Sequence, residues 1–289
     1  MKRYVAAMVV ALLILSAAGP RPASCGRGTV VSADGTSIHY SSAGTGTPAL
    51  VFVHGWCCDE SYWRYQVPYF AGRYTVVTVD LAGHGSSAAG RDRYTMEAYG
   101  EDVAAVVDTL GLDSVILVGH SMGGRVNLEA ALRLPGRVLA LVGVDTYQDF
   151  EMQFPQAQVE QFLTAFSGDF AATTRGYVKT LFPATADSAL VRTIIADMAA
   201  APPAVGIGSM RSALTYDPVS TLNKLDLPVY CINSDRYPAN EAAGKRHAKS
   251  YQVALMPGLG HFVMLEDPET FNDLLDATIR SIEAYGAVK

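Results

Sequence analysis

Cysteine is scarce in this chain of 289 residues, and acidic residues outnumber basic ones. The four cysteines are too few for a disulfide scaffold, and no group of Cys and His has the spacing of zinc ligands, so we expect no metal site. Lys and Arg total 22 against 28 Asp and Glu, which gives a net charge of −6. Because a negative protein is not attracted to phosphate backbones, we expect no nucleic-acid partner.

The chain also lacks an apolar run long enough for a permanent membrane span. Residues 4–18 carry no charge, but a bilayer span needs about 20 apolar residues. A basic start, MKR, precedes this run and the small residues SAA end it, which is typical of a secretory signal. We therefore predict that residues 1–25 are a leader and that the protein is exported, periplasmic or secreted. An uncleaved N-terminal anchor is the alternative.

Cys25 offers a second form of attachment. The stretch from Pro22 to Cys25 resembles the end of a bacterial lipoprotein signal, in which the cysteine is lipidated, although Pro22 stands where leucine is usual. Attachment to a membrane is therefore expected, if it occurs, through the N-terminus or through a lipid on Cys25.

Apolar strand-like runs alternate with helical patterns along most of the chain. After a hairpin signal at Asp34-Gly35, the strands are expected at 49–55, 74–80, 114–119, 138–145, 227–233 and 251–257, with helices between them. Such alternation predicts an α/β fold with a mostly parallel, doubly wound sheet. The carboxyl ends of the strands then carry the active loops.

The alternation stops between residues 146 and 215. This stretch is rich in Phe, Met and Ala and has no convincing strand. We predict about four short helices here, inserted as a cap into a core formed by residues 26–145 and 216–289.

Ser121 lies where a predicted strand passes into a predicted helix, in the pattern Gly119-His120-Ser121-Met122-Gly123. Gly-x-Ser-x-Gly in this context is the nucleophile elbow, a tight turn that tolerates only small neighbours. A serine hydroxyl is a weak nucleophile at pH 7 and needs a base, which in turn needs an orienting acid.

His261 is the histidine best placed to be that base, since it follows the last predicted strand. His120 is expected to pack, and His54 and His84 to brace glycine-rich turns. For the acid we favour Asp235, which follows the strand at 227–233. The alternative acid is Asp145, at the end of the strand at 138–145.

An acyl-transfer site also needs donors for the oxyanion of the transition state. The backbone N–H groups of Trp56, in a glycine turn after the strand at 49–55, and of Met122, after the serine, are the candidates.

These stretches together resemble the α/β-hydrolase superfamily. HGW at 54–56, DLAGHGSS at 80–87, GHSMGG at 119–124 and PGLGHFVMLEDPETF at 257–271 occur in the family's order. The resemblance covers roughly residues 28–286 and implies a capped fold without a cofactor. One departure from the family leaves the identity of the orienting acid undecided between Asp235 and Asp145. Members usually carry this acid in a Gly-x-x-Asp turn, but here the turn reads Asn233-Ser234-Asp235.

The expected function is hydrolysis of carboxylic esters of small to medium, apolar substrates through an acyl-enzyme on Ser121. A ligand-binding or signalling protein with slow turnover and a carbon–carbon bond hydrolase are the alternatives. The partner is a small-molecule ester, and the oligomeric state is left open. The expected substrate-binding residues are apolar: Trp56, Phe150, Phe154, Phe162, Phe182 and Met210.

If residues 1–25 are a cleaved leader, the exported protein should begin near Gly19 or at Cys25, depending on which site is cut. Intact-mass spectrometry of protein recovered outside the cytoplasm measures this start, and a lipid on Cys25 would add its own mass. Recovery of the chain with Met1 intact would contradict a cleaved leader.

Overall fold

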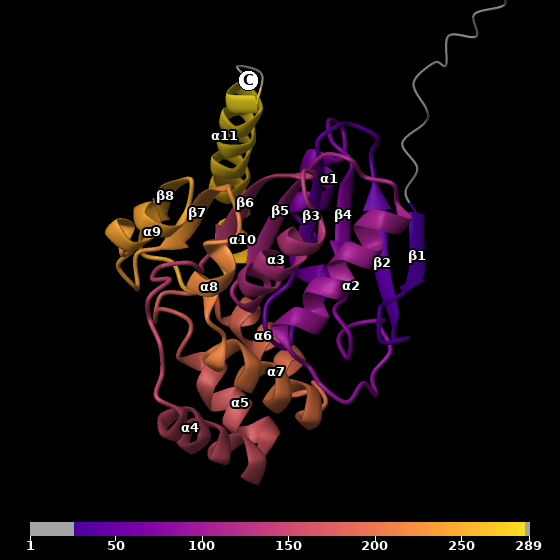
Figure 1. Cartoon of the computed structure of the whole chain (residues 1–289). Coiled ribbons are helices and arrows are strands. Elements are labelled where there is room, and N and C mark those ends of the chain that lie inside the picture. The colour runs from indigo at the N-terminus through magenta and orange to yellow at the C-terminus, as the bar shows by residue number, and fades with distance from the viewer. Residues whose placement is uncertain (1–25, 287–289) are drawn as a thin grey trace, which may run out of the picture.

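The computed structural model describes residues 26–286 (Figure 1). The predicted leader, residues 1–25, lies outside the described residues, and so does Cys25 with the lipidation predicted for it.

An eight-stranded sheet forms the centre of the described chain, in the order β1-β2-β4-β3-β5-β6-β7-β8. β2 pairs antiparallel with β1 and with β4, and the remaining neighbours are parallel, which confirms the mostly parallel sheet. The strands are β1 (Gly26–Val31), β2 (Ser37–Ala43), β3 (Ala49–Val53), β4 (Val76–Val79), β5 (Val115–His120), β6 (Val138–Val144), β7 (Pro228–Ser234) and β8 (Ser250–Met256).

The central strands β3 and β5 are buried along their whole length, as their unbroken apolar sequences predict. Their register aligns the carboxyl ends of neighbouring strands. Gly119 of β5 lies opposite Val53 of β3 on one side and Gly143 of β6 on the other. The residues that follow these three strands therefore meet at one edge of the sheet.

Helices cover the sheet, and in Figure 1 α2 and α3 lie in front of it. α1 packs against α11, and Gln66 Nε2 donates to Asn272 Oδ1 at 3.0 Å between them. The elements outside the insertion between β6 and α8 are η1 (Glu60–Trp63), α1 (Gln66–Phe70), α2 (Met96–Thr109), α3 (Met122–Arg133), α8 (Pro218–Leu222), α9 (Glu241–His247), α10 (Val263–Glu266) and α11 (Pro268–Gly286).

Four helices occupy the stretch in which no strand was expected, and Figure 1 shows them gathered at one end of the molecule. They are α4 (Gln156–Gly168), α5 (Phe170–Lys179), α6 (Ser188–Ala199) and α7 (Pro203–Thr215). We call residues 156–215 the four-helix segment. Asp169 and Asp187 cap α5 and α6 by accepting backbone N–H bonds.

Side chains of the core fasten the four-helix segment in place. Trp56 Nε1 donates to the carbonyl of Gly206 in α7 at 2.7 Å, and its ring lies edge-on to Phe166, Phe170 and Tyr177. Tyr62 Oη donates to Asp197 of α6 at 2.7 Å. The segment is therefore packed onto the core through aromatic and hydrogen-bonded contacts.

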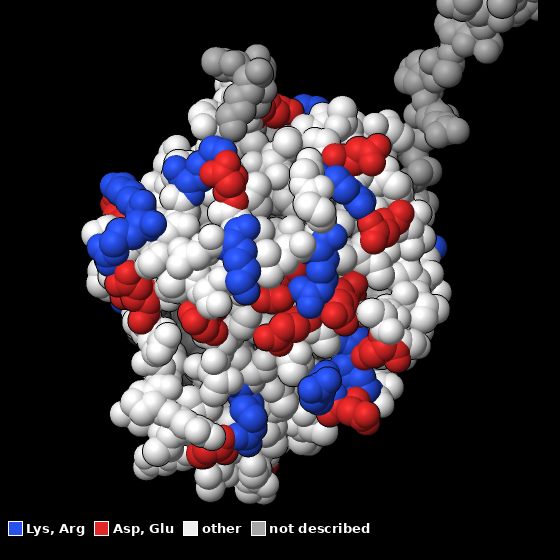
Figure 2. Space-filling view, viewed as in Figure 1, with Lys and Arg blue, Asp and Glu red and all other residues white. Residues whose placement is uncertain are grey.

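Within residues 26–286 no single helix combines the length and apolar composition needed to cross a membrane. Among these residues only α6 and α7 taken together meet both criteria, and they bend by 100° at their junction. On the face shown in Figure 2, basic and acidic side chains are interspersed, without an extended patch of one sign.

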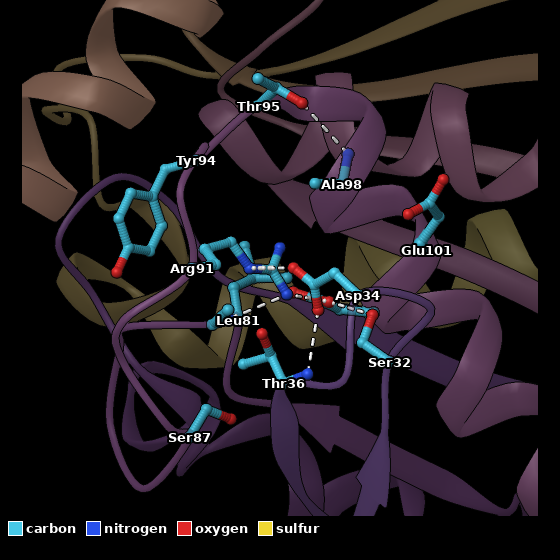
Figure 3. Close-up of polar contacts among 12 residues, drawn as sticks. Ser32, Asp34, Thr36, Leu81, Ser87, Arg91, Tyr94, Thr95, Ala98 and Glu101 are labelled. Carbon is cyan, nitrogen blue, oxygen red and sulfur yellow. Dashed lines mark hydrogen bonds and ion pairs between the residues drawn. The ribbon is translucent and has the colours of Figure 1, made fainter.

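Arg91 anchors the loop between β4 and α2 in a buried ionic cluster (Figure 3). Its guanidinium lies 2.6 Å from Asp102 of α2 and 3.1 Å from Asp34 of the β1–β2 turn. Ser32 Oγ donates to the same Asp102 carboxylate at 2.6 Å. Burial raises the pKa of Asp102 above its usual value in spite of these partners. The hydrogen bonds between Arg91 and Asp102 therefore offset a large cost of removing both charges from water.

Replacing Arg91 by Met should destabilise the fold, because it leaves the Asp102 carboxylate buried without its cation. Loss of one partner of a buried pair typically costs about 3–5 kcal/mol, which urea unfolding followed by circular dichroism measures. The control is Lys245→Met, which removes an ion pair with Glu241 whose side chains are both more than half exposed and should change stability far less. Equal effects of the two substitutions would contradict the role given to Arg91.

Candidate active site

Ser121 stands at the turn between β5 and α3 in a strained backbone conformation. Its φ is 52° and its ψ is −115°, values that persist only where the surrounding structure enforces them. A Cβ on Gly119 would lie 2.5 Å from the Gly123 carbonyl oxygen, and one on Gly123 would lie 2.5 Å from the Val53 oxygen. The glycines are thus required by close backbone approach, and the predicted strand–turn–helix context of the serine is confirmed.

His261 and Asp145 form a short hydrogen bond at the same edge of the sheet. His261 Nδ1 lies 2.6 Å from Asp145 Oδ2, and because a carboxylate can only accept, Nδ1 carries the proton. In the neutral imidazole the other nitrogen, Nε2, is then an acceptor. This is the tautomer that a base acting on a serine hydroxyl requires.

The Asp145 carboxylate is almost fully buried, with 3% of the residue exposed. Its second oxygen accepts from the Ser234 N–H at 2.8 Å and from the Ser234 hydroxyl at 2.9 Å. Burial acts to raise the pKa of Asp145, but the bonds from His261 and Ser234 outweigh it, and the pKa lies below its usual value. The carboxylate is therefore ionised at neutral pH.

The prediction that Asp235 orients the histidine is wrong, and the alternative Asp145 occupies that position. Asp235 is exposed, and its carboxylate accepts instead from the Gly258 N–H at 3.0 Å. The strand β7 ends at Ser234, whose side chain faces Asp145. Because successive residues of an extended strand point in opposite directions, Asp235 faces away.

Backbone and side-chain contacts hold the loop that carries His261. The His261 N–H donates to the carbonyl of Leu181, between α5 and α6, at 2.9 Å. Glu266 accepts from the N–H groups of Gly260 and Phe262 at 2.8 and 3.0 Å. His120 also contacts this loop. Its Nε2 lies 2.9 Å from the His261 carbonyl oxygen, and the centroids of the two histidine rings are 4.7 Å apart. Burial lowers the pKa of His120 to about 3, so His120 packs as a neutral ring, as expected.

Two other histidines also behave as predicted from their glycine-rich turns. His54 Nε2 accepts from the Leu81 N–H at 3.0 Å, and His84 Nδ1 lies 3.1 Å from the Ala82 oxygen. Burial lowers the pKa of both, that of His84 to about 3. They brace the loop after β4 and do not line the cavity described next.

Ser121 and His261 line one cavity of about 140 Å³ between the sheet edge and the four-helix segment. Trp56 and Met122, the residues predicted to supply the oxyanion donors, also line it. Met122 is the first residue of α3, so its N–H lies at the positive end of the helix. The remaining lining residues are Cys58, His120, Arg125, Tyr177, Leu181, Met198, Met210, Ala213, Leu214 and Phe262.

Of the six predicted substrate-binding residues, only Trp56 and Met210 line this cavity. Phe150 and Phe154 line an outer cleft of about 710 Å³ instead. Phe162 is 37% exposed on α4, and Phe182 stacks on Phe262 with ring centroids 5.1 Å apart. An apolar composition alone could not separate helix-packing rings from cavity-lining ones.

The sequence reasoning missed Arg125 and Tyr177 among the lining residues. For Arg125 a signal existed, because it lies in the first turn of the helix that Ser121 caps. For Tyr177 there was none, since α5 reaches the site through tertiary packing of its aromatic rings on Trp56.

Among residues 26–286, one group of side chains has the spacing to hold a metal ion. Ligand atoms of His39, Glu60 and Asp80 lie within 4.8 Å of one another. Both Glu60 oxygens already accept hydroxyl hydrogen bonds, and both Asp80 oxygens accept backbone N–H bonds. None of the three lines the cavity at Ser121, and we read the group as a hydrogen-bonded support between β2, η1 and β4.

Comparison with known proteins agrees with this geometry. Residues 50–274 match the profile of a family described as "Alpha/beta hydrolase family". A pimeloyl-[acyl-carrier protein] methyl ester esterase from Nitrosomonas europaea is 30% identical over 257 residues, which cover 83% of this chain and 99% of that protein. The solved structure of a thermophilic esterase from Thermogutta terrifontis superposes with a TM-score of 0.77 at 23% identity, over 89% of this chain and 99% of that one, which shows the fold.

Other relatives are longer than the matched region. The dihydrolipoyllysine-residue acetyltransferase component of an acetoin cleaving system from Pseudomonas putida is 30% identical over 254 residues, 83% of this chain but 66% of that protein. The corresponding component from Cupriavidus necator is 36% identical over 108 residues, 37% of this chain and 29% of its own length. This chain thus spans less than two thirds of either protein.

Proposed function

The chain belongs to the alpha/beta hydrolase family, and from that premise we propose that it cleaves carboxylic esters with Ser121 as the nucleophile. The observation that carries the proposal is the arrangement at one sheet edge: a strained serine, a histidine in the tautomer that can accept its proton, and a buried carboxylate bonded to that histidine. The esterase among the relatives supports the same reaction class.

The proposed reaction proceeds by acyl transfer. His261 Nε2 takes the proton of the Ser121 hydroxyl while the oxygen attacks the ester carbonyl, and the same proton then passes to the departing alcohol. Water repeats the sequence on the acyl-enzyme and releases the acid. Asp145 keeps the imidazole in the required tautomer and stabilises its charged form.

The tetrahedral intermediate carries a negative oxygen that needs hydrogen-bond donors. We assign this task to the backbone N–H groups of Trp56 and Met122, two residues that line the cavity together with Ser121. Removing one such donor typically costs about 10²–10³ in rate, so the two together supply a large share of the proposed catalysis.

The cavity limits the acyl group that Ser121 can accept. Its volume of about 140 Å³ is well below the 300–1,000 Å³ typical of drug-sized ligand sites. Apolar side chains from three helices close it on one side, namely Leu214 and Met210 of α7, Met198 of α6 and Tyr177 of α5. A short acyl chain is therefore the favoured substrate, with the alcohol portion directed toward solvent.

Substitution of Ser121 by Ala should abolish turnover of 4-nitrophenyl acetate and butyrate, because the variant has no nucleophile. The wild-type protein should turn over at about 1 s⁻¹ or faster, followed as release of 4-nitrophenol. The control is Ser61→Ala, an exposed serine of η1, which should keep full activity. A single slow turnover by the wild type would favour a ligand-binding protein on this scaffold, and activity unchanged in Ser121→Ala would refute the proposal.

The two aspartates give a matched test of the acid. Asp145→Asn should lower kcat for 4-nitrophenyl butyrate by about 10³–10⁴, since an amide can force the histidine into the wrong tautomer. Asp235→Asn should change it less than about threefold, because that carboxylate meets only the Gly258 N–H. If Asp235→Asn were the more damaging change, the assignment of Asp145 would be wrong.

A further inference from the structure

Arg125 introduces a positive charge into the cavity at Ser121. It lies in the first turn of α3, four residues after Ser121, which caps this helix. It lines both the cavity of about 140 Å³ at Ser121 and the outer cleft of about 710 Å³. Arg125 therefore stands at the junction between the proposed acyl site and the surface.

No acidic side chain of residues 26–286 pairs with Arg125, and its guanidinium makes no hydrogen bond to them. Its Nε is buried without a partner. The ionisable groups within electrostatic reach are Tyr147, Tyr177 and Tyr216, which carry no charge at neutral pH. The buried Arg91 forms a contrast, because it contacts two carboxylates.

Arg125 is half-buried, and its Nε is buried without a partner. Arginine stays protonated at neutral pH, and withdrawing part of its guanidinium from water without a partner carries a free-energy cost. Burial lowers the pKa of Arg125, the direction expected of a cation that lacks a counter-charge. A planar guanidinium presents a fork of donors that matches a carboxylate. An anionic ligand would complete this site.

The position of the charge indicates which part of a substrate would carry the anion. The acyl group stays bonded to Ser121 during the reaction and must occupy the space next to it, whereas the alcohol leaves. Ser121 and Arg125 line one cavity of only about 140 Å³, so an acyl chain on Ser121 meets Arg125 within a few carbon atoms. A carboxylate separated from the ester carbonyl by a few carbon atoms fits this arrangement.

We propose that Arg125 binds a carboxylate on the acyl part of the substrate and makes the enzyme selective for half-esters of short dicarboxylic acids. This inference rests on the proposed function at Ser121, whose cavity Arg125 shares. The expected substrate then has an acyl chain that ends in a negative charge, in place of a uniformly apolar acyl chain.

A matched pair of substrates tests the selectivity. Mono-4-nitrophenyl glutarate ends in a carboxylate, and 4-nitrophenyl pentanoate has a similar chain length without the charge. Substituting Arg125 by Met should lower kcat/KM for the glutarate half-ester by about ten- to a hundredfold, as expected for loss of a charged hydrogen bond. The same variant should leave the value for the pentanoate within about threefold, and Arg125→Lys should recover part of the loss.

Arg192→Met serves as the control, because Arg192 is an exposed arginine of α6 and should alter neither substrate. Circular dichroism and the thermal midpoint report whether each variant is folded. If Arg125→Met slowed both esters by the same factor, Arg125 would have a structural role and the proposal would fail, while Ser121-dependent hydrolysis would stand.

Binding of glutarate itself separates this inference from the catalytic proposal. Titration calorimetry with the Ser121→Ala protein needs no turnover, so it remains decisive even if neither ester is hydrolysed. Glutarate should bind the Ser121→Ala protein at least tenfold more tightly than the protein that also carries Arg125→Met. Equal binding by the two proteins, or none by either, would overturn the carboxylate site.

Discussion

The hydrogen bond between His261 and Asp145, 2.6 Å long, is the interaction on which the candidate site depends. Asp145 follows β6 and His261 follows β8, and the bond forms because the parallel register brings the ends of β6, β7 and β8 to one edge. The same register places Ser121 beside them. A shift in the register of one strand would separate the three side chains and leave the Asp145 carboxylate buried without its partner. The site therefore depends directly on the correct strand pairing.

The four-helix segment packs over this edge and partly encloses it, leaving the cavity of about 140 Å³ at Ser121. Trp56 is central to this packing, since its indole N–H donates to Gly206 of α7 while its ring contacts aromatic rings of α4 and α5. Electrostatic interactions are stronger where protein atoms replace water. The half-buried charge of Arg125 would therefore gain from a ligand that neutralises it.

Much of the fold could be predicted because its signals are local. Unbroken apolar runs marked β3 and β5, and Gly119 and Gly123 marked the turn that holds Ser121. The histidine followed from its place after β8. The acid could not be chosen in the same way, because Asp145 and Asp235 each follow a strand beside the right edge. The absence of the usual Gly-x-x-Asp turn was the one clue that the turn at Asp235 differs, and the structure shows that Ser234, the residue before Asp235, donates to Asp145.

Sequence periodicity and turn chemistry were sufficient for the kind of sheet, the strained serine and the general position of His261, since each depends on residues close together in the chain. Contacts between distant segments settled the rest: which carboxylate reaches His261, which rings line the cavity, and whether a charge is paired. Phe150 and Phe182 look as suitable as Met210 in the sequence, yet only Met210 lies at Ser121. Burial and pairing belong to the packed molecule, because they depend on every neighbour at once.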